Sequence, residues 1–164
     1  MILKKKTFNQ INNIDYLVYL PDKYYNDEKS YPLVLFLHGA GERGNNVNSI
    51  KKHGIPKRIE EGVHFPFITI APQCRDGIWW SNIENINILE KLMNYSILDL
   101  KVDKKRIYGT GLSMGGFGIL ELALKVPSLF TAIIAICGGT ITNDLSGLEN
   151  TPTWLFHGED DDVI

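Results

Sequence analysis

Short apolar runs that alternate with helix-period segments constrain the fold of this chain more than any other feature. Residues 33–37 and 67–71 are apolar without alternation, and each run ends at a turn signal, His38-Gly39 or Pro72. Runs of this length without alternation are typical of strands that are covered on both faces. They predict a sheet that lies between two layers of helices.

The rest of the chain continues the same alternation. Strand composition recurs at residues 16–20, 106–110, 130–137 and 153–156. Between these runs, the apolar residues at 86, 89, 92, 93 and 97 follow helical spacing, and residues 118–126 form a second helical segment that ends at Pro127. Strands that alternate with helices predict a three-layer α/β/α sandwich with a mostly parallel sheet.

Composition narrows the class of protein. The 164 residues are 44% apolar and 22% charged, with a net charge of −2, which predicts one soluble domain over residues 1–164 and no nucleic-acid partner. The Lys4-Lys5-Lys6 cluster is interpreted as a solvated end. No signal peptide or bilayer-spanning run is evident, and two cysteines fit neither a disulfide framework nor a metal knuckle. We therefore expect a cytoplasmic protein with no membrane partner, metal or cofactor.

The segment Gly111-Leu112-Ser113-Met114-Gly115 matches the pattern G-x-S-x-G between a predicted strand and a predicted helix. In that context the pattern indicates a sharp turn that holds a serine hydroxyl above the sheet, with flanking glycines that permit close packing. The backbone amide of Met114 would then point to an oxyanion at a helix N-terminus. The sequence predicts Ser113 as a nucleophile.

Two loops at strand ends supply the other candidate groups. The glycine-rich loop His38–Gly44 follows a strand, and the amide of Ala40, with Gly41 close behind, is the candidate second oxyanion donor. For His38 we favour a role in supporting the loop over a role as base. The acidic loop from His157 to Val163 follows the last strand and could hold the acid of a triad, although spacing alone does not choose among its three aspartates. A solvated acidic turn and a weak cation site are the alternatives.

These motifs, in this order, resemble the α/β-hydrolase superfamily. The residues that carry the resemblance are the loop His38–Gly44 with its strand, Ile-Ala-Pro-Gln-Cys followed by Trp79-Trp80, Gly-Leu-Ser-Met-Gly-Gly, and the final His-Gly-Glu-Asp-Asp-Asp-Val. The chain is most similar to the serine esterases and predicted peptidases related to prolyl oligopeptidase and dienelactone hydrolase. The resemblance extends from about Tyr16 to the last residue.

The resemblance implies roles for individual residues. Its acid stands four residues after the histidine of His-Gly-x-x-Asp, which selects Asp161, and it places Ser113 as nucleophile with the amides of Ala40 and Met114 in the oxyanion hole. It also implies a substrate pocket near Trp79 and Trp80, for which packing is an equal alternative. We include His38 and Gly41 among the residues expected at that pocket.

The resemblance also implies an incomplete site. The family's histidine follows the acid, whereas no histidine follows Asp161 in this sequence. We therefore expect a C-terminally truncated α/β-hydrolase fold that lacks its last strand and helix. The strand at 153–156 would then be an open edge at which two copies could dimerise.

Three functions are considered. The first is hydrolysis of a small-molecule carboxylic ester through an acyl-enzyme on Ser113, with the 164 residues alone expected to be inactive because the base is missing. The second is a peptidase or thioesterase with the same groups. The third is a hydrolase-like binding protein without catalysis.

Overall fold

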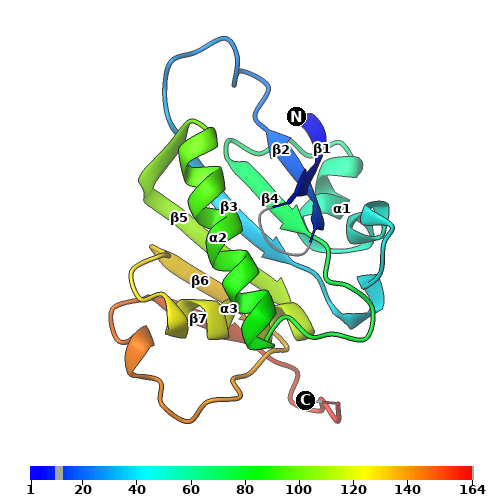
Figure 1. Ribbon diagram of the computed structural model, residues 1–164, viewed down its shortest axis with the longest axis vertical. Coiled ribbons are helices and arrows are strands. Elements are labelled where there is room, and N and C mark those ends of the chain that lie inside the picture. The colour runs from blue at the N-terminus through cyan, green and yellow to red at the C-terminus, as the bar shows by residue number, and fades with distance from the viewer. Residues whose placement is uncertain (10–12, 164) are drawn as a thin grey trace.

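The computed structural model describes residues 1–9 and 13–163, and within them seven strands form one sheet (Figure 1). The strands are β1 (Ile2–Phe8), β2 (Ile14–Leu20), β3 (Tyr31–Leu37), β4 (Ile68–Pro72), β5 (Val102–Leu112), β6 (Ala132–Ile136) and β7 (Thr153–Phe156). Their order across the sheet is β1-β2-β4-β3-β5-β6-β7. Strands β3 to β7 are mutually parallel, whereas β2 is antiparallel to both β1 and β4.

Helices cover both faces of this sheet, which makes three layers. The helices α2 (Ile83–Asp99) and α3 (Met114–Lys125) lie over one face, where they share the larger apolar core with strand residues such as Leu35 and Ile133 (Figure 1). The short helix α1 (Gly54–Glu60) and the 3-10 helix Val47–Lys52 lie over the other face, around Tyr19 and Phe36. The predicted α/β/α sandwich with a mostly parallel sheet is confirmed.

The predicted elements are present, but several are longer than expected. The helix expected at 118–126 begins at Met114, directly after the elbow serine, and the strand expected at 106–110 begins at Val102. The final strand has the predicted bounds. The helix α1 was not predicted, because its seven residues contain a glycine and a proline and its position depends on packing.

The interpretation of Lys4-Lys5-Lys6 as solvated agrees with the exposure of Lys4 and Lys5, but the three residues are not a loose end of the chain. These residues lie in β1, which pairs antiparallel with β2 from Ile2↔Leu20 to Phe8↔Ile14. The lysine side chains still face largely outward, and Phe8 is the residue of this strand that enters the core. Charge on the outer strand of a sheet is a common protection against edge-to-edge pairing.

At the opposite end of the sheet, the residues Thr153–Phe156 carry no charge. The strand β7 stands last in the order, and all four of its residues are exposed.

Among the described residues, no helix has the length and apolar character needed to cross a membrane.

Candidate active site

The serine of the G-x-S-x-G pattern lies at the junction that the pattern predicts. Strand β5 ends at Leu112 and helix α3 begins at Met114, so that Ser113 alone makes the turn, with φ 52° and ψ −119°. A non-glycine residue with positive φ is strained, and such strain persists only where the surroundings hold it. Here the Ser113 amide donates to the carbonyl of Ile136 on β6 at 2.7 Å.

The flanking glycines allow this turn to pack against its neighbours. A Cβ atom on Gly111 would overlap the carbonyl of Gly115, and one on Gly115 would overlap the carbonyl of Leu37. Any larger residue at either position would force α3 away from the sheet. The spacing of the motif therefore follows from the closeness of the strand and the helix.

The first turn of α3 presents free amides beside Ser113. The Ser113 carbonyl accepts from the amides of Gly116 at 2.7 Å and Phe117 at 3.2 Å, so that intrahelical bonding begins at Gly116. The amide of Met114 precedes this point, among the helix-end donors that have no intrahelical acceptor. Such donors at a helix N-terminus favour a negative charge.

The glycine-rich loop after β3 packs directly on the elbow. A Cβ atom on Gly39 would lie 4.0 Å from the Cβ of Ser113 and 3.6 Å from the carbonyl oxygen of Leu112. The loop continues as a 3-10 turn, Ala40–Glu42, whose first residue is Ala40. Ala40 and Met114, whose amides are the predicted oxyanion donors, are thus the first residues of this 3-10 turn and of α3.

His38 is the centre of the hydrogen bonds that hold this loop. Its Nδ1 donates to the carbonyl of Gly39 at 2.6 Å, and its Nε2 accepts from the amide of Cys74 at 3.0 Å. The side chain is fully buried, and burial lowers its pKa from 6.5 to about 4. His38 is therefore a neutral imidazole with the proton on Nδ1. Both ring nitrogens are occupied, so this histidine is not available as a base.

The Gly39 carbonyl that His38 contacts belongs to the same peptide unit as the amide of Ala40. Because hydrogen bonds in a chain polarise one another, a donor on the carbonyl strengthens the amide of that unit as a donor. His38 also fixes the plane of the peptide. The expectation that His38 supports the loop agrees with this geometry, whereas the expectation that it lines a substrate pocket is wrong, because no part of it is exposed.

The two tryptophans have different positions. Trp80 is fully buried, and its Nε1 donates to the carbonyl of His38 at 3.1 Å. Its ring contacts the His38 imidazole edge to face, with centroids 5.3 Å apart. The expectation that Trp80 lines a pocket is therefore wrong. Its ring packs in the core beneath the loop, which was the alternative for this residue. Trp79 is 45% exposed and Gly41 is exposed, so their place at a substrate pocket stays a prediction.

Arg43 is a supporting residue that sequence reasoning missed. Its Nε donates to the carbonyl of Ala40 at 3.0 Å, and a terminal nitrogen donates to the carbonyl of Ile78 at 3.4 Å. The guanidinium thus joins the loop after β3 to the loop after β4. The buried carboxylate of Glu42 lies beside Gly39, and its Oε1 is 3.5 Å from His53 Nε2. The sequence did contain a signal for these roles, because Glu42 and Arg43 are adjacent charged residues inside the glycine-rich loop.

The acidic loop lies at the same edge of the sheet as the elbow, because β5, β6 and β7 are parallel neighbours. Within this loop Asp161 is the least exposed aspartate, with 17% of its side chain accessible. One carboxylate oxygen accepts from the amide of Val163 at 3.0 Å, and the other lies 3.2 Å from His157 Nε2. The structure thus holds Asp161 in a defined position within the loop.

The other histidines have partners away from the elbow. His53 faces Glu42, and His64 faces Asp22 at 2.5 Å. His157 faces Asp161, four residues along the chain. Among the described residues, the hydroxyl of Ser113 has no hydrogen-bond partner.

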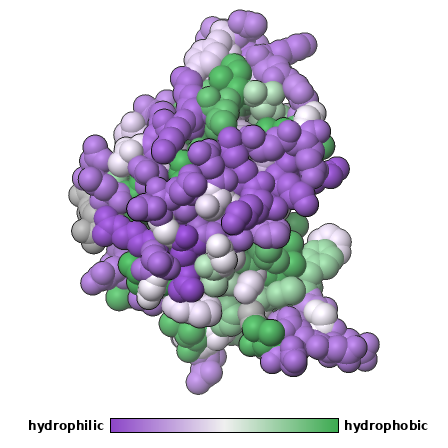
Figure 2. All heavy atoms as spheres, turned by 90° about the vertical axis from the view of Figure 1, so that its right-hand side faces the viewer, coloured by the Kyte–Doolittle hydropathy of each residue, from purple (hydrophilic) through white to green (hydrophobic). Residues whose placement is uncertain are grey.

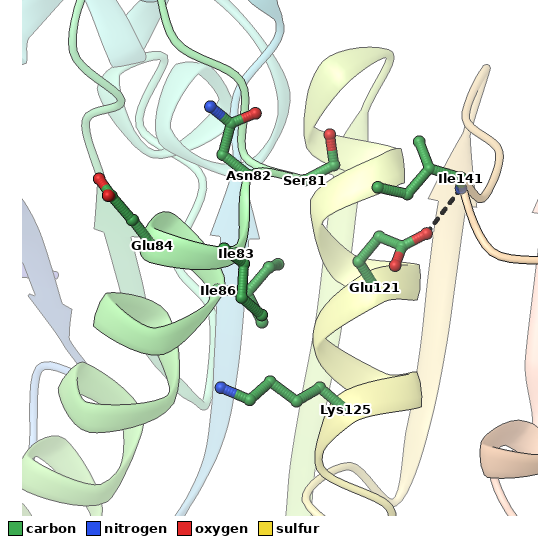
Figure 3. Close-up of a pocket in the computed structure, with 8 residues that line it drawn as sticks. All are labelled: Ser81, Asn82, Ile83, Glu84, Ile86, Glu121, Lys125 and Ile141. Carbon is green, nitrogen blue, oxygen red and sulfur yellow. Dashed lines mark hydrogen bonds between the residues drawn. The ribbon is translucent and has the colours of Figure 1, made fainter.

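A hollow of about 520 Å³ lies between the start of α2 and the middle and C-terminal turns of α3 (Figure 3). Figure 3 shows Ser81 and Asn82 at one end, Lys125 at the other, and Ile141 across from α3, where its amide donates to Glu121 at 2.7 Å. Phe117, Glu121 and Lys125 are spaced four residues apart on α3, so they follow Ser113 along one side of that helix. Three isoleucines and five polar or charged residues line this hollow, and Ser113 is not among them.

Comparison with known proteins gives curated relatives that are named as esterases. No protein-family model matches the chain. A probable feruloyl esterase C of Aspergillus clavatus is 30% identical over 159 residues, which are 94% of this chain and 57% of that protein. The chain therefore spans little more than half the length of this curated relative.

Solved structures show the same arrangement of elements. A thermostable esterase is 32% identical, with a TM-score of 0.80 over 99% of this chain and 48% of the other. The feruloyl esterase module of Clostridium thermocellum, solved with sinapinate, is 15% identical, with a TM-score of 0.75 over 96% of this chain and 67% of the other. At that identity the second likeness concerns the fold alone.

Proposed function

Since the chain belongs to the α/β-hydrolase superfamily, we propose that the protein hydrolyses carboxylic esters through an acyl-enzyme on Ser113. The observation that carries the proposal is the strained Ser113 backbone at the turn between β5 and α3. Ser128 and Cys137 also have positive φ, but only Ser113 lies directly between a strand and the helix that follows it.

The reaction begins with attack of the Ser113 hydroxyl oxygen on the ester carbonyl. The carbonyl oxygen takes up negative charge, which the amides of Met114 and Ala40 would stabilise by hydrogen bonds. The bond between the acyl carbon and the alcohol oxygen then breaks, and the alkoxide takes up the proton that the Ser113 hydroxyl lost. The acyl group stays on Ser113 until water attacks it, which releases the carboxylic acid and restores the serine. Preorganised donors are effective because they need no rearrangement when charge develops, and the contacts of His38 and Arg43 supply that preorganisation at Ala40.

Asp161 is proposed as the acid that orients the base of the reaction. Support comes from its limited exposure and from its position at the carboxyl ends of the parallel strands. Because no histidine contacts Ser113 among the described residues, we expect the 164-residue protein to react slowly. Removal of the base from a serine triad costs on the order of 10⁶ in turnover, while the oxyanion hole retains part of the acceleration.

Feruloyl esters are the first substrates to test, because the curated relative is named a probable feruloyl esterase. The exposed ring of Trp79 offers a surface on which an aromatic ester could stack. An activated phenyl ester of ferulic acid is the sharper probe, since its leaving group needs no protonation and so depends less on a base.

The decisive experiment compares Ser113→Ala with wild type for labelling by a fluorophosphonate and for release of the activated phenol. Because no histidine contacts Ser113 among the described residues, we expect both signals in wild type to be slow but above the rate without protein, and we expect both to fall to that background rate in Ser113→Ala. Ser128→Ala is the matched control, because Ser128 is also a serine with positive φ, 72°, but lies outside the elbow. The proposal fails if labelling of wild type is absent, or if Ser113→Ala is labelled as fast as wild type.

A further inference from the structure

The segment of residues 78–80, in the loop after β4, is bonded to the glycine-rich loop after β3 at both of its ends. At the first end, the carbonyl of Ile78 accepts from the guanidinium of Arg43 at 3.4 Å. At the other end, Nε1 of Trp80 donates to the carbonyl of His38 at 3.1 Å. These two contacts fix the relative position of two loops that are far apart in the sequence, with one residue between them.

Trp79 is that residue, and its own backbone is bonded as well. Its carbonyl accepts from Nδ2 of Asn85, a buried side chain of α2, at 2.8 Å. The neighbouring Trp80 packs on α3, where a Cβ atom on Gly118 would lie 2.5 Å from the Cβ of Trp80. Gly118 follows Ser113 by five residues, which is about 7.5 Å along a helix. The backbone of Trp79 is thus fixed relative to both the glycine-rich loop and the helix that begins after the elbow serine.

The side chain of Trp79 is 45% exposed although its backbone is anchored. Exposure alone does not mark a contact for substrate, since Figure 2 shows hydrophobic residues gathered in the lower part of one side of the molecule. The distinguishing feature of Trp79 is its anchored backbone beside the oxyanion loop. An aromatic ring on a fixed backbone offers a surface for stacking at a low cost in conformational entropy.

Arg43 links this ring to the oxyanion loop. Its Nε donates to the carbonyl of Ala40 at 3.0 Å, while Nη1 donates to the carbonyl of the peptide unit whose amide belongs to Trp79. A planar guanidinium holds two acceptors in a fixed relation, which the single ammonium group of lysine does not reproduce. Burial lowers the pKa of His38, and the charge of Arg43 lowers it further, which agrees with a guanidinium close to the imidazole.

We propose that Arg43 is a positioning residue that couples the ring of Trp79 to the oxyanion donor at Ala40. This role rests on the proposed ester hydrolysis at Ser113 and adds how the site selects its substrate. When the aromatic group of an ester stacks on Trp79, the bridge through Arg43 aligns the Ala40 amide with the ester carbonyl. Stacking then contributes to the alignment of the reacting groups as well as to binding, whereas an ester without an aromatic group gains nothing from the bridge.

The rates at which two fluorophosphonates label Ser113 measure this coupling. One probe carries a phenyl ring, and the other carries a methyl group in its place. In both, the serine oxygen bonds to phosphorus, the P–F bond breaks, fluoride leaves, and the hydroxyl proton passes to solvent. We expect Trp79→Ala and Arg43→Lys each to lower the ratio of the phenyl to the methyl rate by about threefold to tenfold, the size of an aromatic contact. The double variant should lower this ratio no further, because either change breaks the same link.

Two control variants and a stability measurement separate this coupling from loss of structure. Tyr25→Ala removes a ring that is 54% exposed in the loop after β2, and Arg58→Lys changes an exposed guanidinium on α1. Both should keep the wild-type ratio of the two rates. Urea unfolding of every variant reports its stability, and a general loss of structure slows both probes alike and leaves their ratio unchanged.

An unchanged ratio in Trp79→Ala or in Arg43→Lys overturns the coupling, and so does a double variant in which the two effects multiply. In each of these cases Ser113 is still labelled, so the proposed hydrolysis stands. If wild type is not labelled at Ser113 by either probe, the proposed function fails, and the role of Arg43 fails with it.

Discussion

Acidification tests the neutral, buried state of His38, on which the oxyanion loop depends. The side chain has no exposed surface, and burial lowers its pKa from 6.5 to about 4. Because the pKa is lower in the folded protein than in the unfolded chain, the unfolded chain takes up the proton first. The stability that neutral His38 supports is complete above the unfolded value and is lost as the pH falls toward the folded value.

The magnitude follows from the two pKa values. Each pH unit between them removes about 1.4 kcal/mol from the free energy of unfolding, which amounts to about 3 kcal/mol over the interval. In His38→Asn the side chain does not titrate, although its amide can still donate to the carbonyl of Gly39. We expect the variant to be less stable at neutral pH, since it leaves the buried amide of Cys74 without its acceptor at a cost of about 1–3 kcal/mol.

The assay is urea unfolding followed by tryptophan fluorescence at several pH values between about 7 and 4. Wild type should lose about 3 kcal/mol more than His38→Asn over this range. Carboxyl groups whose pKa is lowered by backbone hydrogen bonds, such as Asp103 and Asp144, destabilise both proteins alike on acidification and cancel in the comparison. Parallel losses in the two proteins would refute a buried, neutral His38.

Three further predictions concern the core, the thiols and the elbow. Leu92→Ala should lower the free energy of unfolding by about 2–5 kcal/mol in urea, because Leu92 is fully buried, whereas Leu98→Ala should change it by less than about 0.5 kcal/mol. Iodoacetamide should alkylate Cys137 before Cys74, as read by peptide mass spectrometry, because burial raises the pKa of the Cys74 thiol to about 11. Gly115→Ala should lower the melting temperature and slow labelling of Ser113, because its Cβ would overlap a carbonyl of β3; an unchanged melt would contradict that packing.

Sequence reasoning succeeded where a local pattern has a single physical cause. The G-x-S-x-G spacing predicted the turn at Ser113, because only glycine permits the strand and the helix to approach so closely. Apolar runs without alternation predicted β3 and β4, because strands buried on both faces exclude polar residues. The roles of Ser113, Asp161 and the two oxyanion amides remain predictions until they are tested chemically.

Only the tertiary structure decided how the groups around the elbow are used. Nothing local to His38 or Trp80 shows that both side chains point inward, since their burial depends on α2, α3 and the loop after β4. The same holds for Lys4-Lys5-Lys6, which form a strand because β2 offers a free edge. Local composition selects an element, but long-range pairing and packing decide which face of it meets water. The sequence alone therefore determined the turn that exposes Ser113, and the packed structure determined what supports that turn from below.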